Sequence, residues 1–191
     1  IYQILEKDFE RGLIKKEVLH DTKGRIKISE DYKDLETKNF IIEAIYEDLD
    51  IKSEALKTAE KFIKPNGIIA SNTSTIPISI LASKIKNSER FIGIHFFSPV
   101  HKMKLVEIIK ANSTSSSTLK KALDFAKAIT KTPIVVNDSP GFYTTRVFTK
   151  YPCEGMAMLD EGIKATSIEN AGKKAGYPVG PLALSDEVNI A

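Results

Sequence analysis

Short runs of aliphatic and β-branched residues alternate with amphipathic segments over the first 138 residues, and this alternation restricts the fold more than any other feature of the sequence. Such runs are typical of strands that are buried on both faces, and the segments between them have apolar residues at helical spacing. Strands that alternate with helices predict a doubly wound α/β domain with a parallel sheet. The predicted strands span 39–46, 68–70, 90–97, 105–110 and 133–137, and the predicted helices among them span 51–63, 77–85 and 117–129.

The pattern changes at the segment 138–141, Asp-Ser-Pro-Gly. No strand is predicted after it, and residues 142–162, 166–175 and 181–190 have helical patterns separated by glycine and proline. This second region is too short to form a core of its own, so it should pack on the first domain or on a partner. We therefore predict an α/β domain over residues 1–138 and the start of an all-helical domain over residues 139–191.

The composition argues against several classes of protein. The net charge is only +3, and the basic residues are spread along the chain instead of being clustered with aromatic residues as in nucleic-acid-binding proteins. Cys153 is the single cysteine, which excludes an intramolecular disulfide and points to a reducing compartment. No apolar run approaches the roughly 20 residues that span a bilayer. His20, His95 and His101 lack the spacing of zinc ligands, so we predict no metal site.

A run of hydroxyl and amide side chains, Ser71 to Thr75, follows the predicted strand 68–70. Open α/β sheets bind ligands at the carboxyl ends of their strands, and these side chains can hydrogen-bond a substrate oxygen or a ribose. The same residue types also cap helices. Capping of the helix that begins at Pro77 explains the run more simply when it is considered alone.

His95 lies in one predicted strand and Glu107 in the next. Glu107 is surrounded by four aliphatic residues, where a carboxylate is costly to bury unless it has a partner. If the two strands are neighbours, Glu107 can reach His95, fix the tautomer of the imidazole and stabilise its protonated form. Such a histidine is a suitable general base. The alternatives are a structural histidine in the core and a solvent-facing glutamate on an edge strand.

A third candidate segment begins at Pro140 and leads into the predicted helix 142–162. Gly141 permits a tight entry, and the hydroxyls of Tyr143, Thr144 and Thr145 fall in the first helical turn, where they can face a cleft between the domains. Helix capping is again the alternative.

Together these segments resemble the 3-hydroxyacyl-CoA dehydrogenase family. The resemblance rests on residues 70–74, 93–100, 103–109 and 138–142, in this order, and on the later segment 176–181. It implies a Rossmann-like NAD domain joined to a helical domain that mediates dimerisation. It also implies the oxidation of the 3-hydroxyl of an acyl-CoA to a ketone, with NAD as the cofactor.

The resemblance also assigns roles to individual residues. His95 is expected to be the base, Glu107 its orienting partner and Ser74 a hydrogen-bond partner of the reacting oxygen near the nicotinamide. Thr145 is expected to contact the substrate. The cofactor-binding positions expected from the family are Glu47, Lys52, Asn72, Ser74 and Ser98.

Three features depart from the family pattern. The sequence has no glycine-rich fingerprint, so we expect the N-terminal glycine-loop unit to be missing, residues 1–19 to be the helical region that follows it, and the chain alone to be a weak catalyst. Ser98 and Thr145 stand where many members have asparagine, and a hydroxyl has neither the reach nor both groups of an amide. The helical domain is shorter than is usual in the family.

Residues 96–99, 141–146 and 184–188 are most similar to a multifunctional subgroup, that of the α-subunit of the mitochondrial trifunctional enzyme of fatty-acid oxidation. This similarity implies an acyl-CoA substrate, a preceding hydratase domain, and other subunits of a β-oxidation complex or a homodimer as partners. It also implies a mitochondrial location, with the bacterial cytoplasm as the alternative, and membrane association only through the complex. A stand-alone dehydrogenase and a catalytically degenerate relative remain the other interpretations.

Overall fold

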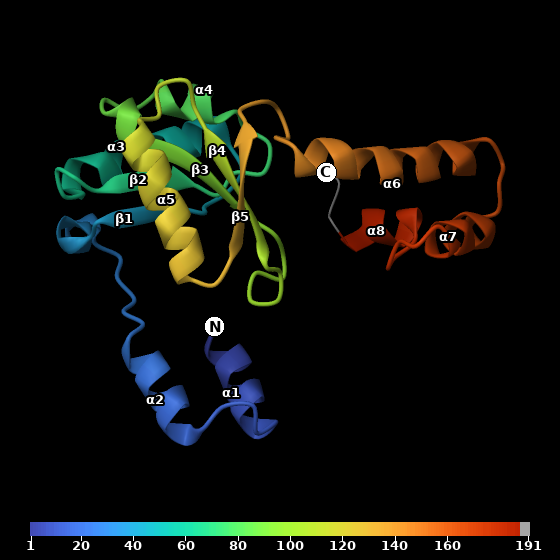
Figure 1. Cartoon of the computed structure of the whole chain (residues 1–191), viewed down its shortest axis with the longest axis horizontal. Coiled ribbons are helices and arrows are strands. Elements are labelled where there is room, and N and C mark those ends of the chain that lie inside the picture. The colour runs from blue at the N-terminus through green and yellow to red at the C-terminus, as the bar shows by residue number, and fades with distance from the viewer. Residues whose placement is uncertain (188–191) are drawn as a thin grey trace.

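The computed structural model describes residues 1–187 and contains one five-stranded sheet (Figure 1). Its strands lie side by side in chain order: β1 (Phe40–Glu43), β2 (Ile68–Ser71), β3 (Phe91–Phe96), β4 (Leu105–Lys110) and β5 (Thr132–Asn137). Two helices, α3 (Leu49–Phe62) and α4 (Ile78–Ala82), pack on one face, and α5 (Ser116–Ala128) packs on the other. The predicted Rossmann-like α/β class is confirmed.

Each face of the sheet has its own apolar core, because alternate residues of a strand point to opposite sides. Ile69 and Phe91 pack with Leu56 of α3 and Leu81 of α4. Their chain neighbours Ile68 and Ile92 belong to the second core, with Ala122 and Ala126 of α5. The inner strands β2, β3 and β4 are therefore buried on both faces, as their continuous apolar sequences predict, whereas the edge strand β5 is partly exposed.

The sheet differs from an all-parallel one at a single pair. The pairs β1–β2, β2–β3 and β4–β5 are parallel, whereas β3 and β4 are antiparallel. Residues 97–104, which connect β3 to β4, contain no helix and are fewer than the dozen or so that a parallel crossover needs. The antiparallel register places His95 directly opposite Glu107.

The first strand is shorter than the sequence predicts, since β1 ends at Glu43 instead of residue 46. The buried Glu43 carboxylate accepts a hydrogen bond of 2.7 Å from the backbone N–H of Ile45, which turns the chain away from the sheet. Ile45 and Tyr46 are exposed as a result. The prediction extended the strand to residue 46 because these two side chains are apolar.

The N-terminal helices α1 (Tyr2–Glu10) and α2 (Lys16–Gly24) stand apart from the sheet (Figure 1). Neither contains a buried residue. A helix that follows a phosphate-binding turn packs one face on the sheet. Residues 1–19 contain α1 and the start of α2, so helices are present as predicted, but they do not occupy that place in the fold.

After β5 the chain is helical in the described residues, as predicted. The helices are α6 (Thr144–Asp160), α7 (Ala165–Lys174) and α8 (Pro181–Glu187), and α6 runs away from the sheet with the other two beside it (Figure 1). Pro181 packs closely on two helical glycines, Gly155 and Gly172, where any side chain would clash with it. Residues 188–190 of the predicted last helix lie outside the described range. None of the helices within residues 1–187 combines the length and apolarity that a membrane span requires.

Candidate active site

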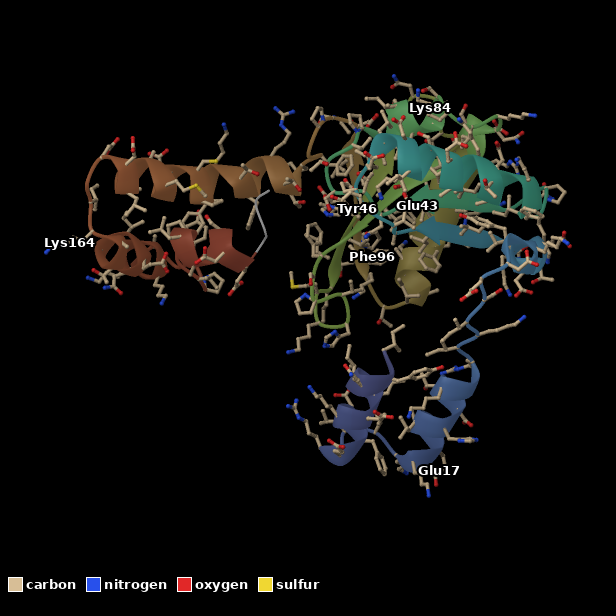
Figure 2. All side chains as sticks on the ribbon, turned by 180° about the vertical axis from the view of Figure 1, so that it is seen from behind. Glu17, Glu43, Tyr46, Lys84, Phe96 and Lys164 are labelled. Carbon is tan, nitrogen blue, oxygen red and sulfur yellow. The ribbon has the colours of Figure 1, made fainter. Side chains whose placement is uncertain are left out.

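The predicted site residues gather around the carboxyl ends of β1, β2 and β3. Asn72, directly after β2, links these ends, because its backbone N–H donates to the Glu43 carbonyl at 2.8 Å and its Oδ1 accepts from the Phe96 N–H at 2.9 Å. Figure 2 shows Glu43, Tyr46 and Phe96 at this edge of the sheet. Two buried polar clusters lie here, one centred on Glu107 and the other centred on Lys52.

The first cluster pairs His95 with Glu107. The His95 Nδ1 atom lies 2.7 Å from Glu107 Oε2, and the exposed fractions of the two side chains are 8% and 0%. The solvent-facing alternative for Glu107 is therefore wrong. The aromatic ring centroids of Phe97 and Phe142 lie 4.7 Å and 5.9 Å from that of His95, so apolar surface surrounds the pair.

The start of α6 also donates hydrogen bonds to Glu107. Glu107 Oε1 accepts from the backbone N–H groups of Tyr143 at 3.2 Å and Thr144 at 2.9 Å, and Oε2 accepts from the Thr144 hydroxyl at 2.7 Å. Burial alone would raise the pKa of Glu107. The hydrogen bonds from His95 and Thr144 outweigh burial and lower the pKa of this carboxyl below its usual value. Glu107 is therefore ionised at neutral pH.

This ionised partner fixes the tautomer of His95. A carboxylate only accepts hydrogen bonds, so the imidazole must donate from Nδ1. In the neutral ring Nε2 then carries the lone pair, and among residues 1–187 no group is hydrogen-bonded to it. The geometry thus leaves one basic nitrogen available to a ligand.

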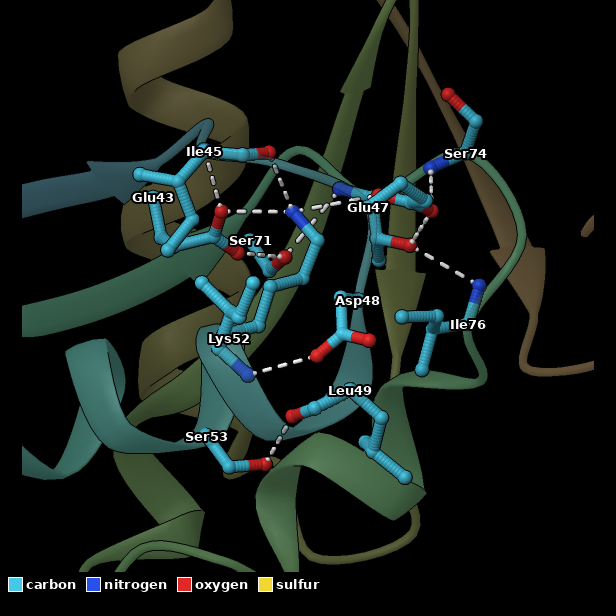
Figure 3. Close-up of polar contacts among 12 residues, drawn as sticks. Glu43, Ile45, Glu47, Asp48, Leu49, Lys52, Ser53, Ser71, Ser74 and Ile76 are labelled. Atoms are coloured by element: carbon cyan, nitrogen blue, oxygen red, sulfur yellow. Dashed lines mark hydrogen bonds and ion pairs between the residues drawn. The ribbon is translucent and has the colours of Figure 1, made fainter.

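The second cluster lies beneath the ends of β1 and β2 (Figure 3). The Lys52 Nζ atom lies 2.7 Å from Glu43 Oε1, 3.2 Å from Glu47 Oε2 and 3.1 Å from the Ile45 carbonyl oxygen. Only 1% of the Lys52 side chain is exposed. The Ser71 hydroxyl donates to the other Glu43 oxygen at 2.6 Å. Lys52 Nζ thus donates two hydrogen bonds, to Glu43 and the Ile45 carbonyl, and forms an ion pair with Glu47.

Glu47 connects this cluster to the loop that contains Ser74 (Figure 3). Its Oε1 atom accepts from the Thr73 hydroxyl, from the backbone N–H groups of Ser74 and Thr75 at 3.1 and 3.2 Å, and from the Thr75 hydroxyl at 3.1 Å. Burial raises the pKa of Glu47, but the Thr73 hydrogen bond and the charge of Lys52 outweigh it and lower this pKa. The hydroxyl run thus folds into a loop that is bound to Glu47.

This loop is not the cap of α4. Pro77 stands at the N-cap position, and Asp138 instead accepts from the backbone N–H groups of Ile78 at 2.7 Å and Ser79 at 2.8 Å. The simpler capping explanation of the run 71–75 is therefore wrong. Ser74 is left exposed, and its hydroxyl has no hydrogen-bond partner among residues 1–187.

The remaining two predicted residues, Ser98 and Thr145, lie in segments next to these clusters. Ser98 is exposed in the loop after β3, and Thr145 is half-buried in the first turn of α6. Within the described part of the chain, neither side chain is hydrogen-bonded to another predicted site residue. Groups of three or more metal-ligand side chains are likewise not found between residues 1 and 187.

Sequence reasoning did not assign roles to three residues that shape the site. Glu43 and Asp138 hold loops, and Thr144 binds Glu107. Glu43 and Asp138 each come at the end of an apolar run, a position that could have identified them. The role of Thr144 depends on how α6 docks, which no local pattern specifies.

Comparison with known proteins agrees with this site. Residues 1–139 match the family described as 3-hydroxyacyl-CoA dehydrogenase, NAD binding domain, and residues 141–191 match the C-terminal domain of the same enzymes. The match to the NAD binding domain supports NAD as the cofactor.

Solved structures of similar proteins include two bacterial enzymes. The (S)-3-hydroxybutyryl-CoA dehydrogenase of Ralstonia eutropha is 36% identical with a TM-score of 0.94, over 97% of this chain and 66% of that protein. The 3-hydroxybutyryl-CoA dehydrogenase of Escherichia coli is 31% identical with a TM-score of 0.91, over 98% of this chain and 40% of that protein. The dehydrogenase part of multifunctional enzyme 1 from C. elegans shares the fold. It is 24% identical with a TM-score of 0.67, over 97% of this chain and 46% of that protein.

The chain thus spans less than two thirds of the length of both bacterial enzymes. Its family follows from the two domain matches, which together extend over almost every residue, and from a buried His95–Glu107 pair in the expected register. The chain belongs to the 3-hydroxyacyl-CoA dehydrogenase family.

Proposed function

We propose that this protein catalyses the NAD-dependent oxidation of an L-3-hydroxyacyl-CoA to a 3-ketoacyl-CoA. The observation that carries the proposal is the buried His95–Glu107 pair, in which Nδ1 is bound and Nε2 is hydrogen-bonded to no group among residues 1–187. A base with this arrangement can accept a proton from a substrate hydroxyl without competition from the protein.

In the proposed reaction His95 Nε2 takes the proton of the 3-hydroxyl group. The imidazolium that results is stabilised by the negative charge of Glu107, 2.7 Å from Nδ1. Ser74, which is exposed, donates a hydrogen bond from its hydroxyl to the reacting oxygen. Thr145 contacts the substrate from the first turn of α6.

The residues at the ends of β1 and β2 fit NAD by the chemistry of their groups. Glu47 presents a carboxylate that is 39% exposed, a suitable acceptor for ribose hydroxyls, and Ser74 and Ser98 present exposed hydroxyls that can bind the nicotinamide amide. Asn72 holds these strand ends together, and Lys52 supports Glu47 from beneath. When bound, NAD supplies the hydride acceptor.

The wider context is also a proposal. The motifs 96–99 and 141–146 favour a dehydrogenase domain within a multifunctional hydratase/dehydrogenase subunit of mitochondrial β-oxidation. Its partners would be the other subunits of such a complex or a second copy of the chain. The alternative is a stand-alone dehydrogenase; the R. eutropha relative, at 36% identity, is named as a dehydrogenase. The sequence upstream of Ile1 in the gene distinguishes the two, because a hydratase domain would precede this chain only in the first case.

The decisive experiment measures NADH formation from a 3-hydroxyacyl-CoA by the full-length protein and its His95→Gln variant. We expect a loss of about 10²- to 10⁴-fold in kcat, the usual contribution of a general base. His101→Gln is the matched control, since His101 is exposed in the loop after β3. An inactive wild-type protein with NAD bound would refute the proposal in favour of a degenerate relative, with Thr145 as the first residue to test.

A further inference from the structure

The hydroxyl of Thr144 bonds outside its own helix, as that of Thr118 does in donating to the Glu89 carbonyl at 2.8 Å, whereas four other helical hydroxyls bond within theirs. Ser53, Thr58, Thr149 and Ser185 each donate to the backbone carbonyl four residues earlier in the chain, the local bond that serine and threonine usually make in helices. The Thr144 hydroxyl instead donates to Glu107 Oε2, a residue of β4, at 2.7 Å. The same oxygen atom also accepts the hydrogen bond from His95 Nδ1.

The backbone of Thr144 binds the same carboxylate. Its N–H donates to Glu107 Oε1 at 2.9 Å, so one residue holds both oxygen atoms of the acid. With the Tyr143 N–H and His95, the carboxylate has four donors and its plane is fixed. Rotation of the Glu107 side chain would break at least the Thr144 and His95 hydrogen bonds together.

The turn before α6 aims these donors at Glu107. Gly141 and Phe142 have φ values of +70° and +50°, in the left-handed region that an aromatic residue rarely adopts. Phe142 is buried beside His95, and the packing around its side chain holds the residue in this conformation. The start of the helical region is thereby placed against the catalytic pair.

From this geometry we infer that Thr144 is a positioning residue for the proposed dehydrogenase reaction, acting through Glu107 on the orientation of His95. This inference rests on the proposed function. It assigns no contact with substrate or NAD to Thr144. Instead it links the packing of α6 on the sheet to the orientation of His95. Glu107 has its full set of hydrogen-bond donors only when α6 is packed against β4.

The test compares Thr144→Val, Thr144→Ser and Thr149→Val in the full-length protein. Valine keeps the shape of threonine and removes its hydroxyl, serine keeps the hydroxyl, and Thr149→Val makes the same change one turn further along α6, at a hydroxyl bound only to its own helix. We expect Thr144→Val to lower kcat about tenfold, the loss that corresponds to roughly 1.4 kcal/mol. The KM should stay within about a factor of two, because substrate contacts are untouched.

Rescue by serine and a silent Thr149→Val variant would support the inference. Equal kcat values for Thr144→Val and the wild type would overturn it, as would an equal loss in Thr149→Val, which would indicate a general effect on α6. If Thr144→Val does not fold, Thr144→Ala and Thr144→Ser differ only by the hydroxyl and provide the same comparison.

A second readout does not depend on turnover. The low-field NMR signal of the His95 Nδ1 proton should shift or broaden in Thr144→Val and should keep its wild-type position in Thr144→Ser and Thr149→Val. If the wild-type protein proves inactive, the proposed function fails, but this signal still tests whether Thr144 holds the pair. An unchanged signal in Thr144→Val would overturn the inference by itself.

Discussion

The two buried polar clusters contain the same kind of group, a carboxylate removed from water, but they treat its charge in different ways. Glu107 is surrounded by neutral donors and one imidazole, and within the described range 1–187 no group is hydrogen-bonded to the other ring nitrogen of that imidazole. Glu43 and Glu47 instead share the ammonium group of Lys52, which also donates a hydrogen bond to the Ile45 carbonyl.

The difference separates a group that can act from groups that hold the structure. An unshared lone pair on a histidine beside a fixed negative charge can accept a proton and lose it again. A buried ammonium group paired with two carboxylates fixes the two segments on which its partners lie. The first cluster therefore suits chemistry, and the second suits the positioning of the Ser74 loop.

The largest effect is expected from Glu107→Gln, which turns the first cluster into a neutral one. The Glu107 Oε1 position accepts from two backbone N–H groups, so the glutamine oxygen should stay there and its NH₂ group should face His95 Nδ1. Nδ1 would then accept, and the proton would move to Nε2, the nitrogen that must be free. We expect kcat to fall about 10³-fold, within the range of a lost general base.

The control for this change is Glu154→Gln, at an exposed position of the same helix that donates to Glu107. Its kcat should equal that of the wild type. A Glu107→Gln variant that keeps more than about a third of the wild-type kcat would show that the charge of Glu107 is not needed, and that the contrast between the two clusters is mistaken.

Much of the sheet could be predicted from the sequence, because its signals are local. The strand 105–110 coincides with β4, and the helical patterns after residue 141 mark real helices. The pairing of His95 with Glu107 could be predicted only on the assumption that their two strands are neighbours. The missing information was the antiparallel step between β3 and β4, for which the helix-free connection 97–104 was the available signal.

Other features depend on packing that no short pattern contains. Lys52 lies in an amphipathic helix whose other lysines reach solvent, so its burial against Glu43 could not be read from spacing. The family resemblance suggested a cofactor contact at Lys52, and only the folded chain shows that its ammonium group pairs with Glu43 and Glu47. Thr144 is similar, because its role exists only once α6 has docked on β4.

Lys52→Met tests the second cluster and should affect stability more than chemistry. Removing the ammonium group leaves the buried Glu43 carboxylate without its cation, a change that costs about 3–5 kcal/mol in buried pairs. Lys61→Met, an exposed position on the same helix, should change the free energy of unfolding by less than about 0.5 kcal/mol. Chemical denaturation of the full-length protein measures both. If the two variants were equally stable, Lys52 would not be the anchor of this cluster.

Gly93→Ala tests whether the close packing of β3 against α4 is needed for stability. Gly93 precedes His95 by two residues in β3, and a Cβ atom there would lie 2.6 Å from Ile78 Cγ1 in α4 and 2.9 Å from Ile109 Cβ in β4. Overpacking of this kind costs about 1–3 kcal/mol, and it would push α4 and the Ser74 loop away from His95. Gly24→Ala, with open space around the new Cβ, is the matched control. Thermal unfolding that is equal in both variants would mean that β3 and α4 separate easily.

The smallest effect expected is on the acid side of the stability curve. The pKa values of Glu107 and Glu47 lie below the usual 4.5 in the folded protein, so their contributions to stability are present above pH 4.5 and are lost as the pH falls through the lowered values. The stability gap between the wild type and Glu107→Gln should therefore narrow as the pH falls below 4.5. The gap for Glu47→Gln should narrow less, because water reaches the 39% of that side chain that is exposed and screens its charge. Urea unfolding at a series of pH values measures both gaps, and a gap that does not change with pH for Glu107→Gln would mean that its donors do not favour the charged form.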